Sequence, residues 1–167
     1  GLGKNMQEAL FKGLVSAGYK VEKESRGGVL ISVNHRDQPE IVNIARKLDE
    51  MGYKLYATEG TAHEIAQLGT DVEVVGKLGR DNKVFEMLEG GEIDYVILTG
   101  STEPGYIRDF IHLNHRCVQL GIPCLTSLDT AGALADILAS RYNQRNTELV
   151  DICHLRTERQ RLKFAKM

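Results

Sequence analysis

The sequence predicts an α/β fold of the Rossmann-like class, a three-layer sandwich around a five-stranded, mainly parallel sheet. Two observations support this prediction. Strand-like and helix-like patterns alternate five times with short links, which requires right-handed crossovers and a parallel sheet covered on both faces. The first strand pattern, Val29-Leu30-Ile31-Ser32-Val33, is almost wholly apolar, as is typical of a strand buried on both faces.

Each element follows from local signals. Asn5 is the expected N-cap of a first helix that ends at Gly18, and Pro39 marks the start of a second that ends at Gly52. Apolar residues at helical spacing predict further helices over 62–68, 82–88, 107–120 and about 130–142. Strands are expected over 29–33, 54–57, 72–75, 94–98 and 124–126, and a further strand pattern covers 148–152.

Composition and charge narrow the class of protein. The chain has 167 residues, of which 42% are hydrophobic and 26% charged, with a net charge of −2. These values fit a globular domain and argue against a nucleic-acid-binding or membrane-binding surface. Cys117, Cys124 and Cys153 lack C-x-x-C spacing, which predicts reduced thiols in a cytoplasmic protein. We expect a helical arm over 1–26, a body over 27–145 and a basic tail over 146–167.

Small polar loops follow all five predicted strands. In a parallel sheet these loops meet at one edge, where such folds bind their ligands. The loops offer backbone amides, hydroxyls and cations, which suit a phosphate or carboxylate. Caps and turns use the same residue types, so one loop alone is uninformative, but five together favour a small anionic ligand. The candidate binding residues are Asn34, Arg36, Thr58, Gly60, Thr61, Lys77, Thr99, Gly100, Ser101 and Thr126.

The sequence offers no clear catalytic or metal-binding constellation. His112 and His115 lie three residues apart on a predicted helix, but no third metal ligand is placed, and solvated or interface histidines are the simpler interpretation. Asp81 near Lys77 and Arg80 is either a general base or part of a loop salt bridge. No Walker A loop and no G-x-G-x-x-G occur. We therefore expect no chemistry, metal or cofactor in this segment.

Six segments in order and spacing resemble a known family. They include "LYATEGTA" (Leu55–Ala62), "VEVVGKL" (Val72–Leu78), "GEIDYVILT" (Gly91–Thr99) and "GIPCLTSLDTA" (Gly121–Ala131). Together they resemble the methylglyoxal-synthase-like domain that closes the large subunit of carbamoyl-phosphate synthase, over about residues 27–137. The opening residues 1–20 are similar to the segment that leads into that domain, which predicts a C-terminal fragment.

The resemblance implies regulation of an enzyme rather than catalysis. In those synthases the domain binds an effector such as UMP, IMP or N-acetylglutamate and shifts an ATP- and Mg²⁺-dependent synthesis that serves the pyrimidine and arginine pathways. It implies as partners the rest of the large subunit and the glutaminase small subunit, and a homo-oligomer contact. Thr58 and Thr61 match the two threonines that hold the effector's phosphate or carboxylate, and Lys77 matches the family's lysine.

Some residues depart from the family pattern. Gln38 stands where many members have a phosphate-binding lysine, and Leu98 replaces an asparagine. The same fold hosts methylglyoxal synthase, a lyase acting on dihydroxyacetone phosphate. Asn34, Ser101, Tyr106 and Ile107 fall where that enzyme needs His, Asp, His and Asp. We keep the lyase and a non-binding oligomerisation module as alternatives.

Overall fold

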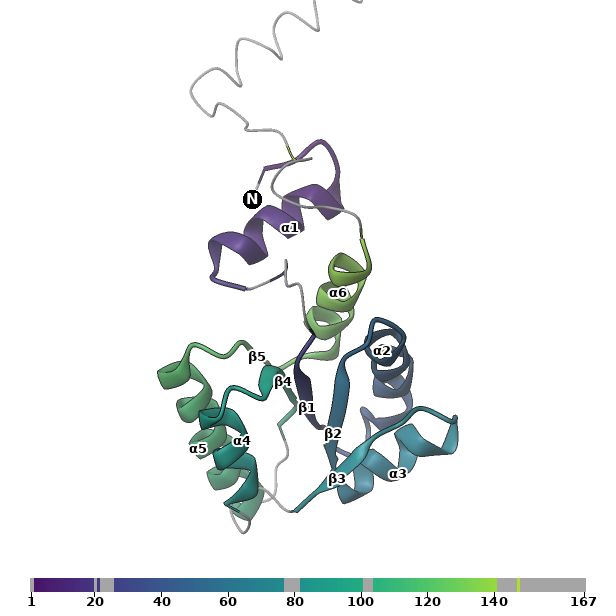
Figure 1. Ribbon diagram of the computed structural model, residues 1–167, viewed down its shortest axis with the longest axis vertical. Coiled ribbons are helices and arrows are strands. Elements are labelled where there is room, and N and C mark those ends of the chain that lie inside the picture. The colour runs from purple at the N-terminus through teal and green to yellow at the C-terminus, as the bar shows by residue number, and fades with distance from the viewer. Residues whose placement is uncertain are drawn as a thin grey trace, which may run out of the picture. The chain divides into compact units, whose positions relative to one another are not determined.

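The computed structural model describes residues 2–19, 21, 26–76, 82–100, 104–140 and 147 (Figure 1). They belong to two units, one with residues 1–21 and 141–167 and the other with residues 22–140. The first unit holds helix α1 (Met6–Ser16). Its N-cap Asn5 accepts a hydrogen bond from the Glu8 amide at 2.9 Å, so the predicted cap is confirmed. The predicted boundaries of the arm, the body and the tail stay predictions.

A five-stranded sheet in the order β3-β2-β1-β4-β5 forms the centre of the second unit. All pairings between these strands are parallel, which confirms the predicted α/β class. The strands are β1 (Gly28–Ser32), β2 (Lys54–Thr58), β3 (Glu73–Val75), β4 (Ile93–Leu98) and β5 (Cys124–Leu125). Ile31 of β1 pairs with Ala57 on one side and Ile97 on the other, so the ends of these three strands are level.

Helices cover both faces of the sheet (Figure 1). They are α2 (Gln38–Glu50), α3 (Glu59–Gln67), α4 (Lys83–Glu89), α5 (Pro104–Leu120) and α6 (Leu128–Ala139). Helix α2 packs against α3 and α6 on one side, and α4 packs against α5 on the other. Among the described helices, none combines the length and the hydrophobicity needed to cross a bilayer.

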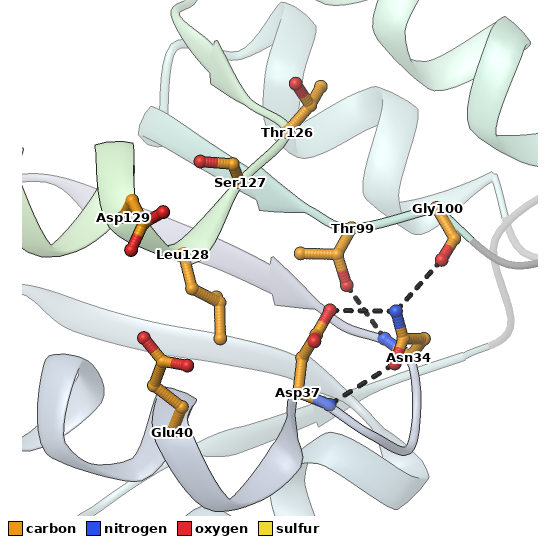
Figure 2. A pocket seen from close by; sticks show the side chains of 9 residues that line it. All are labelled: Asn34, Asp37, Glu40, Thr99, Gly100, Thr126, Ser127, Leu128 and Asp129. Carbon is orange, nitrogen blue, oxygen red and sulfur yellow. Dashed lines mark hydrogen bonds between the residues drawn. The ribbon is translucent and has the colours of Figure 1, made fainter.

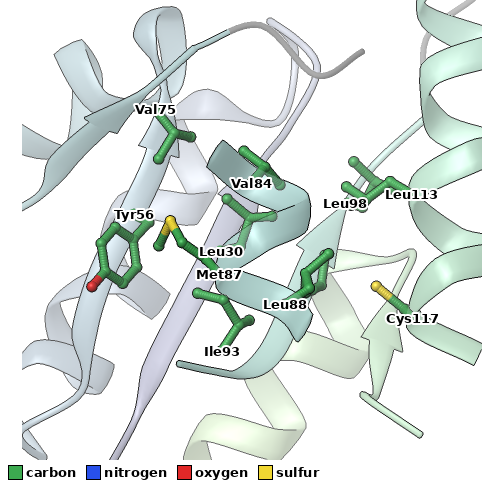
Figure 3. Packing of buried hydrophobic residues seen from close by; sticks show 11 residues of the cluster. Leu30, Tyr56, Val75, Val84, Met87, Leu88, Ile93, Leu98, Leu113 and Cys117 are labelled. Carbon is green, nitrogen blue, oxygen red and sulfur yellow. The ribbon is translucent and has the colours of Figure 1, made fainter. Parts of the chain in front are cut away.

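The core between the sheet and the α4–α5 pair fixes which strand residues face α5 (Figure 3). Leu30 of β1 and Tyr56 of β2 both belong to this core, together with Leu113 and Cys117 of α5. Because side chains alternate along a strand, residues two positions further on return to the same face. Ser32 and Thr58 are those residues, so both end their strands on the face that α5 covers.

The predicted helix starts are wrong in three places. Helix α3 begins at Glu59 rather than at residue 62, α5 at Pro104 rather than at 107, and α6 at Leu128 rather than at 130. In each case residues that suggested a loop, such as Gly60 and Pro104, form the first helical turn. For α3 the consequence is functional, because Gly60 and Thr61 lie inside the helix instead of in a turn before it. The strand pattern over 148–152 lies outside the described residues.

Candidate functional site

The parallel order brings the ends of all described strands to one edge of the sheet. Eight of the ten predicted binding residues are described there, and Lys77 and Ser101 lie outside the described residues. Seven of the eight fall into two neighbourhoods, and Arg36 lies on the turn beside them. Thr58, Gly60 and Thr61 lie at the junction of β2 and α3. Asn34, Thr99, Gly100 and Thr126 line a cavity bounded by α2 and α6.

The β2–α3 junction leaves the first amides of α3 open. Thr58 is the N-cap, with φ −65° and ψ 151°, yet its side chain makes no capping hydrogen bond. The amides of Glu59, Gly60 and Thr61 have no acceptor within the helix, because they belong to its first turn. No acceptor in the described part of the chain meets them either. These amides and the helix dipole make the start of α3 electropositive.

The Thr58 hydroxyl turns toward a row of other hydroxyls instead. It lies 3.3 Å from Oγ of Ser32 and 3.5 Å from Oγ1 of Thr61. Ser32 Oγ in turn lies 3.1 Å from the hydroxyl of Tyr106, which comes from the first turn of α5. Ser32 and Thr61 are both 1% exposed, whereas Thr58 and Tyr106 are half-buried. We call Tyr106, Ser32, Thr58 and Thr61 the hydroxyl row.

Backbone groups anchor both ends of the hydroxyl row. The Val33 amide donates to Oγ1 of Thr61 at 3.3 Å, and that hydroxyl lies 3.5 Å from the Val33 carbonyl oxygen. At the other end the Tyr106 hydroxyl lies 3.2 Å from the Thr99 carbonyl oxygen and 3.4 Å from that of Ser32. Burial raises the pKa of Tyr106, so this phenol keeps its proton at neutral pH.

Gln38 lies beside the same junction. A methyl group built on Gly60 would meet Nε2 of Gln38 at 3.3 Å, so the amide nitrogen of Gln38 stands directly over the start of α3. Its oxygen lies 2.7 Å from Nδ1 of His35. Because an amide oxygen only accepts, His35 donates from Nδ1 here. This bond directs the donor end of Gln38 toward Gly60.

The Asn34 side chain has a full set of partners within the protein (Figure 2). Its Oδ1 accepts from the amides of Arg36 at 2.9 Å and Asp37 at 3.2 Å. Its Nδ2 donates to Oδ2 of Asp37 at 2.8 Å and to the Gly100 carbonyl at 3.0 Å. The Asn34 amide donates to Oγ1 of Thr99 at 2.9 Å. Asn34 thus joins the end of β1 to the end of β4, and its predicted role in binding stays a prediction.

The cavity has a different electrostatic character from the β2–α3 junction. Its volume is about 350 Å³, and Figure 2 shows residues from α2, α6 and the ends of β1, β4 and β5 around it. Asp37, Glu40 and Asp129 give this lining carboxylates, and the described lining holds no lysine or arginine. Arg36, exposed on the neighbouring turn, does not line it. An anion is therefore repelled on this side and attracted to the start of α3.

The described residues hold no group of three His, Cys, Asp or Glu side chains placed to bind a metal ion. His112 and His115 are exposed on α5, and Asp81 lies outside the described residues. Cys117 and Cys124 are free thiols.

Sequence reasoning identified the edge and the β2–α3 junction but missed Ser32 and Tyr106 as members of the site. Ser32 looked like one polar residue within a strand, although a serine at the last position before a strand end is a usable signal. Tyr106 was noted only for falling where the lyase needs a histidine, and its contact with Ser32 could not be predicted because only the three-dimensional packing brings the start of α5 over β1.

Two comparisons with known proteins place the chain among its relatives. The family model of the MGS-like domain matches residues 40–126. Among solved structures, the crystal structure of methylglyoxal synthase from Elizabethkingia anophelis NUHP1 superposes with a TM-score of 0.53 at 25% sequence identity. The match covers 70% of this chain and 79% of that one. It supports the same arrangement of strands and helices.

Proposed function

Because the chain belongs to the family of MGS-like domains, we propose that it is an effector-binding regulatory domain of a carbamoyl-phosphate synthase large subunit. The segments "LYATEGTA" and "GIPCLTSLDTA", which resemble that domain of the synthase, support this assignment. The domain binds a small anionic metabolite at the edge where the strands end. It changes the rate of an ATP- and Mg²⁺-dependent synthesis carried out elsewhere in the parent enzyme.

One observation carries the proposal, namely the open start of α3. The side chain of the N-cap Thr58 makes no capping hydrogen bond, so the amides of Gly60 and Thr61 remain available to an anion. The amide nitrogen of Gln38 adds a donor directly above Gly60. A phosphate or carboxylate that sits here receives hydrogen bonds from preorganised donors, which makes charge-assisted bonds of this kind comparatively strong.

The surroundings limit the ligand to one anionic group. The hydroxyl of Thr61 is buried and hydrogen-bonded to Val33, so we expect its backbone amide to meet the ligand. The carboxylates of Asp37 and Asp129 repel a second negative charge on the cavity side but accept hydrogen bonds from hydroxyl or amino groups. UMP and IMP are candidate effectors of this kind, whereas N-acetylglutamate has two carboxylates and would have to hold the second one away from the cavity.

A lyase of the methylglyoxal synthase type is the second candidate, because a solved structure of that enzyme shares the fold. Such an enzyme must abstract a proton, which requires positioned acid and base groups. Asn34 and Tyr106 stand at two of the positions concerned, and both side chains are hydrogen-bonded within the protein. Neither an amide nor a buried phenol with a raised pKa is a base at neutral pH. The regulatory function is therefore favoured.

A ligand-binding screen together with one activity assay distinguishes the effector-binding domain from the lyase. Inorganic phosphate, UMP, IMP, ornithine and N-acetylglutamate are titrated into the 167-residue chain while its thermal unfolding is followed. A ligand at a hundred times its dissociation constant stabilises the fold by about 2.7 kcal/mol. The absence of any shift would count against an effector site. Formation of methylglyoxal from dihydroxyacetone phosphate, abolished by Asp81→Asn, would favour the lyase instead.

The remaining parts of the proposal concern the parent enzyme. Its partners are the other domains of the large subunit, the glutaminase small subunit and a further copy of the chain, and its location is the cytoplasm. Co-purification of the full-length large subunit with a glutaminase subunit tests whether the chain belongs to such a large subunit and whether that subunit binds a glutaminase.

A further inference from the structure

The hydroxyl row has a direction, which follows from counting protons. Each hydroxyl carries one proton, and a carbonyl oxygen only accepts. The Tyr106 hydroxyl lies 3.2 Å from the Thr99 carbonyl and 3.4 Å from that of Ser32, so we assign its one proton to the nearer carbonyl, that of Thr99. The Tyr106 oxygen then accepts from Ser32 at 3.1 Å, and Ser32 accepts from Thr58 at 3.3 Å. All three protons therefore point away from α3 and toward β4.

This direction matters at the start of α3. With its proton turned toward Ser32, Thr58 presents only lone pairs to a group that approaches the amides of Gly60 and Thr61. Lone pairs repel an anion, whereas an O–H group would bind it. The row reverses if Thr58 is to donate to an anion and still share a hydrogen bond with Ser32. Thr58 then donates to the anion, Ser32 donates to Thr58, and Tyr106 donates to Ser32.

When the row reverses, the hydrogen bonds between Tyr106, Ser32 and Thr58 are kept, but the bond from Tyr106 to the Thr99 carbonyl is lost. Tyr106 has a single proton, so it gives up its hydrogen bond to the Thr99 carbonyl when it donates to Ser32. We propose that Tyr106 is a positioning residue of the anion site, which acts through Ser32 to set the direction of the Thr58 hydroxyl. This role rests on the proposed function, since it describes how that same site accepts its anion. It also links anion binding at β2 to the end of β4.

The burial of Ser32 and Thr99 supports this link between the ends of β2 and β4. Ser32 is 1% exposed and Thr99 is 4% exposed, so water does not replace a missing partner at either position. The tyrosine phenol keeps its proton, since burial raises its pKa. The number of protons in the row is therefore fixed, and we expect a change at Thr58 to be passed to Tyr106 through the buried Ser32.

The test uses inorganic phosphate as the probe and the 167-residue chain as the protein. Phosphate is titrated at constant ionic strength while the backbone amide signals of Gly60 and Thr61 are followed by NMR. Tyr106→Phe removes the bond that phosphate otherwise breaks, so we expect it to bind phosphate about three- to ten-fold more tightly. Tyr53→Phe is the matched control, because it removes a hydroxyl that Arg26 contacts at 3.0 Å near the opposite end of β2. It should bind phosphate as the wild type does.

A second variant distinguishes positioning from a general structural effect. Ser32→Ala interrupts the row, so adding Tyr106→Phe to it should cause no further change in phosphate affinity. Equal effects of Tyr106→Phe in both backgrounds would overturn the proposal, as would an unchanged or weaker affinity of Tyr106→Phe alone. Absence of phosphate binding in the wild type and in every variant would instead overturn the proposed function, and this role with it.

One readout needs no ligand. If Ser32 donates to Tyr106, it stabilises the phenolate form, and Ser32→Ala should raise the pKa of Tyr106 in a titration followed by the ring ¹³C signals. An unchanged pKa of Tyr106 would show that Ser32 and Tyr106 do not share the hydrogen bond on which the proposed row depends.

Discussion

Nε2 of Gln38 lies 3.3 Å from the point where a side chain on Gly60 would begin. One neutral amide thus occupies the space above the first turn of α3, at the place where the resemblance to the synthase family predicts a lysine. The site consequently lacks a positive charge at a position where its geometry would suit one. This relationship provides a direct way to adjust the affinity of the site.

Gln38→Lys should tighten phosphate binding about ten-fold at low ionic strength, because it places a cation beside the open amides of α3. Gln67→Lys is the matched control, since it adds the same charge to the far end of α3, roughly 10 Å from Gly60. Titration calorimetry of both variants at two salt concentrations measures the effect. Equal gains from both would mean that net charge alone is responsible.

Gly60→Ala should separate stability from binding. Alanine is favoured over glycine in a helix by about 0.5–1 kcal/mol, so the variant should unfold at a slightly higher urea concentration. The new methyl group displaces the Gln38 amide, so phosphate affinity should fall at the same time. A loss of stability would show that the Gln38 side chain cannot move aside.

Asn34→Asp should make stability depend on pH. The change replaces the donor that faces Oδ2 of Asp37 at 2.8 Å and the Gly100 carbonyl at 3.0 Å with an acceptor. The introduced carboxyl group therefore has a folded-state pKa above its unfolded value. Its protonated form is tolerated below about pH 4, and stability is lost as the pH rises through the folded-state pKa, by about 2–3 kcal/mol at pH 7.

Urea unfolding at pH 4 and pH 7 measures this dependence. Asn43→Asp provides the comparison, because Asn43 is exposed on α2 and its side chain, unlike that of Asn34, has no described hydrogen bond to a carboxylate. Parallel pH profiles for the two variants would contradict the structural role given to Asn34.

Cys124 should react with iodoacetamide before Cys117 does. A hydrogen bond from Cys117 lowers the pKa of the Cys124 thiol, whereas the same contact and burial raise the pKa of Cys117. Since the thiolate is the reactive form, labelling at pH 8 followed by peptide mapping should find Cys124 modified first. Cys117→Ala should slow that labelling, and faster labelling of Cys117 in the wild type would contradict the assignment.

The sequence allowed the order and type of every described element to be predicted, because apolar runs and glycine stops are local signals. The starts of α3, α5 and α6 were missed. For the first two the reason is that Gly60 and Pro104 are residues that usually mark loops, whereas here they lie in the first helical turn. The division of the edge into an open helix start and an acidic cavity was also missed. It depends on α6 bringing Asp129 near Asp37 and Glu40 of α2, which no local pattern reveals.

The two outer strands of the described sheet are also its shortest, with three residues in β3 and two in β5. Glu73 of β3 is additionally held between Lys54 at 3.2 Å and Lys83 at 3.0 Å, so charged side chains crowd this border. An edge strand as short and as charged as β3 offers few backbone N–H and C=O groups with which another polypeptide could pair. Neighbouring molecules will therefore recognise this domain through its helical surfaces and connecting segments, and continuous sheets running from one subunit into the next are disfavoured.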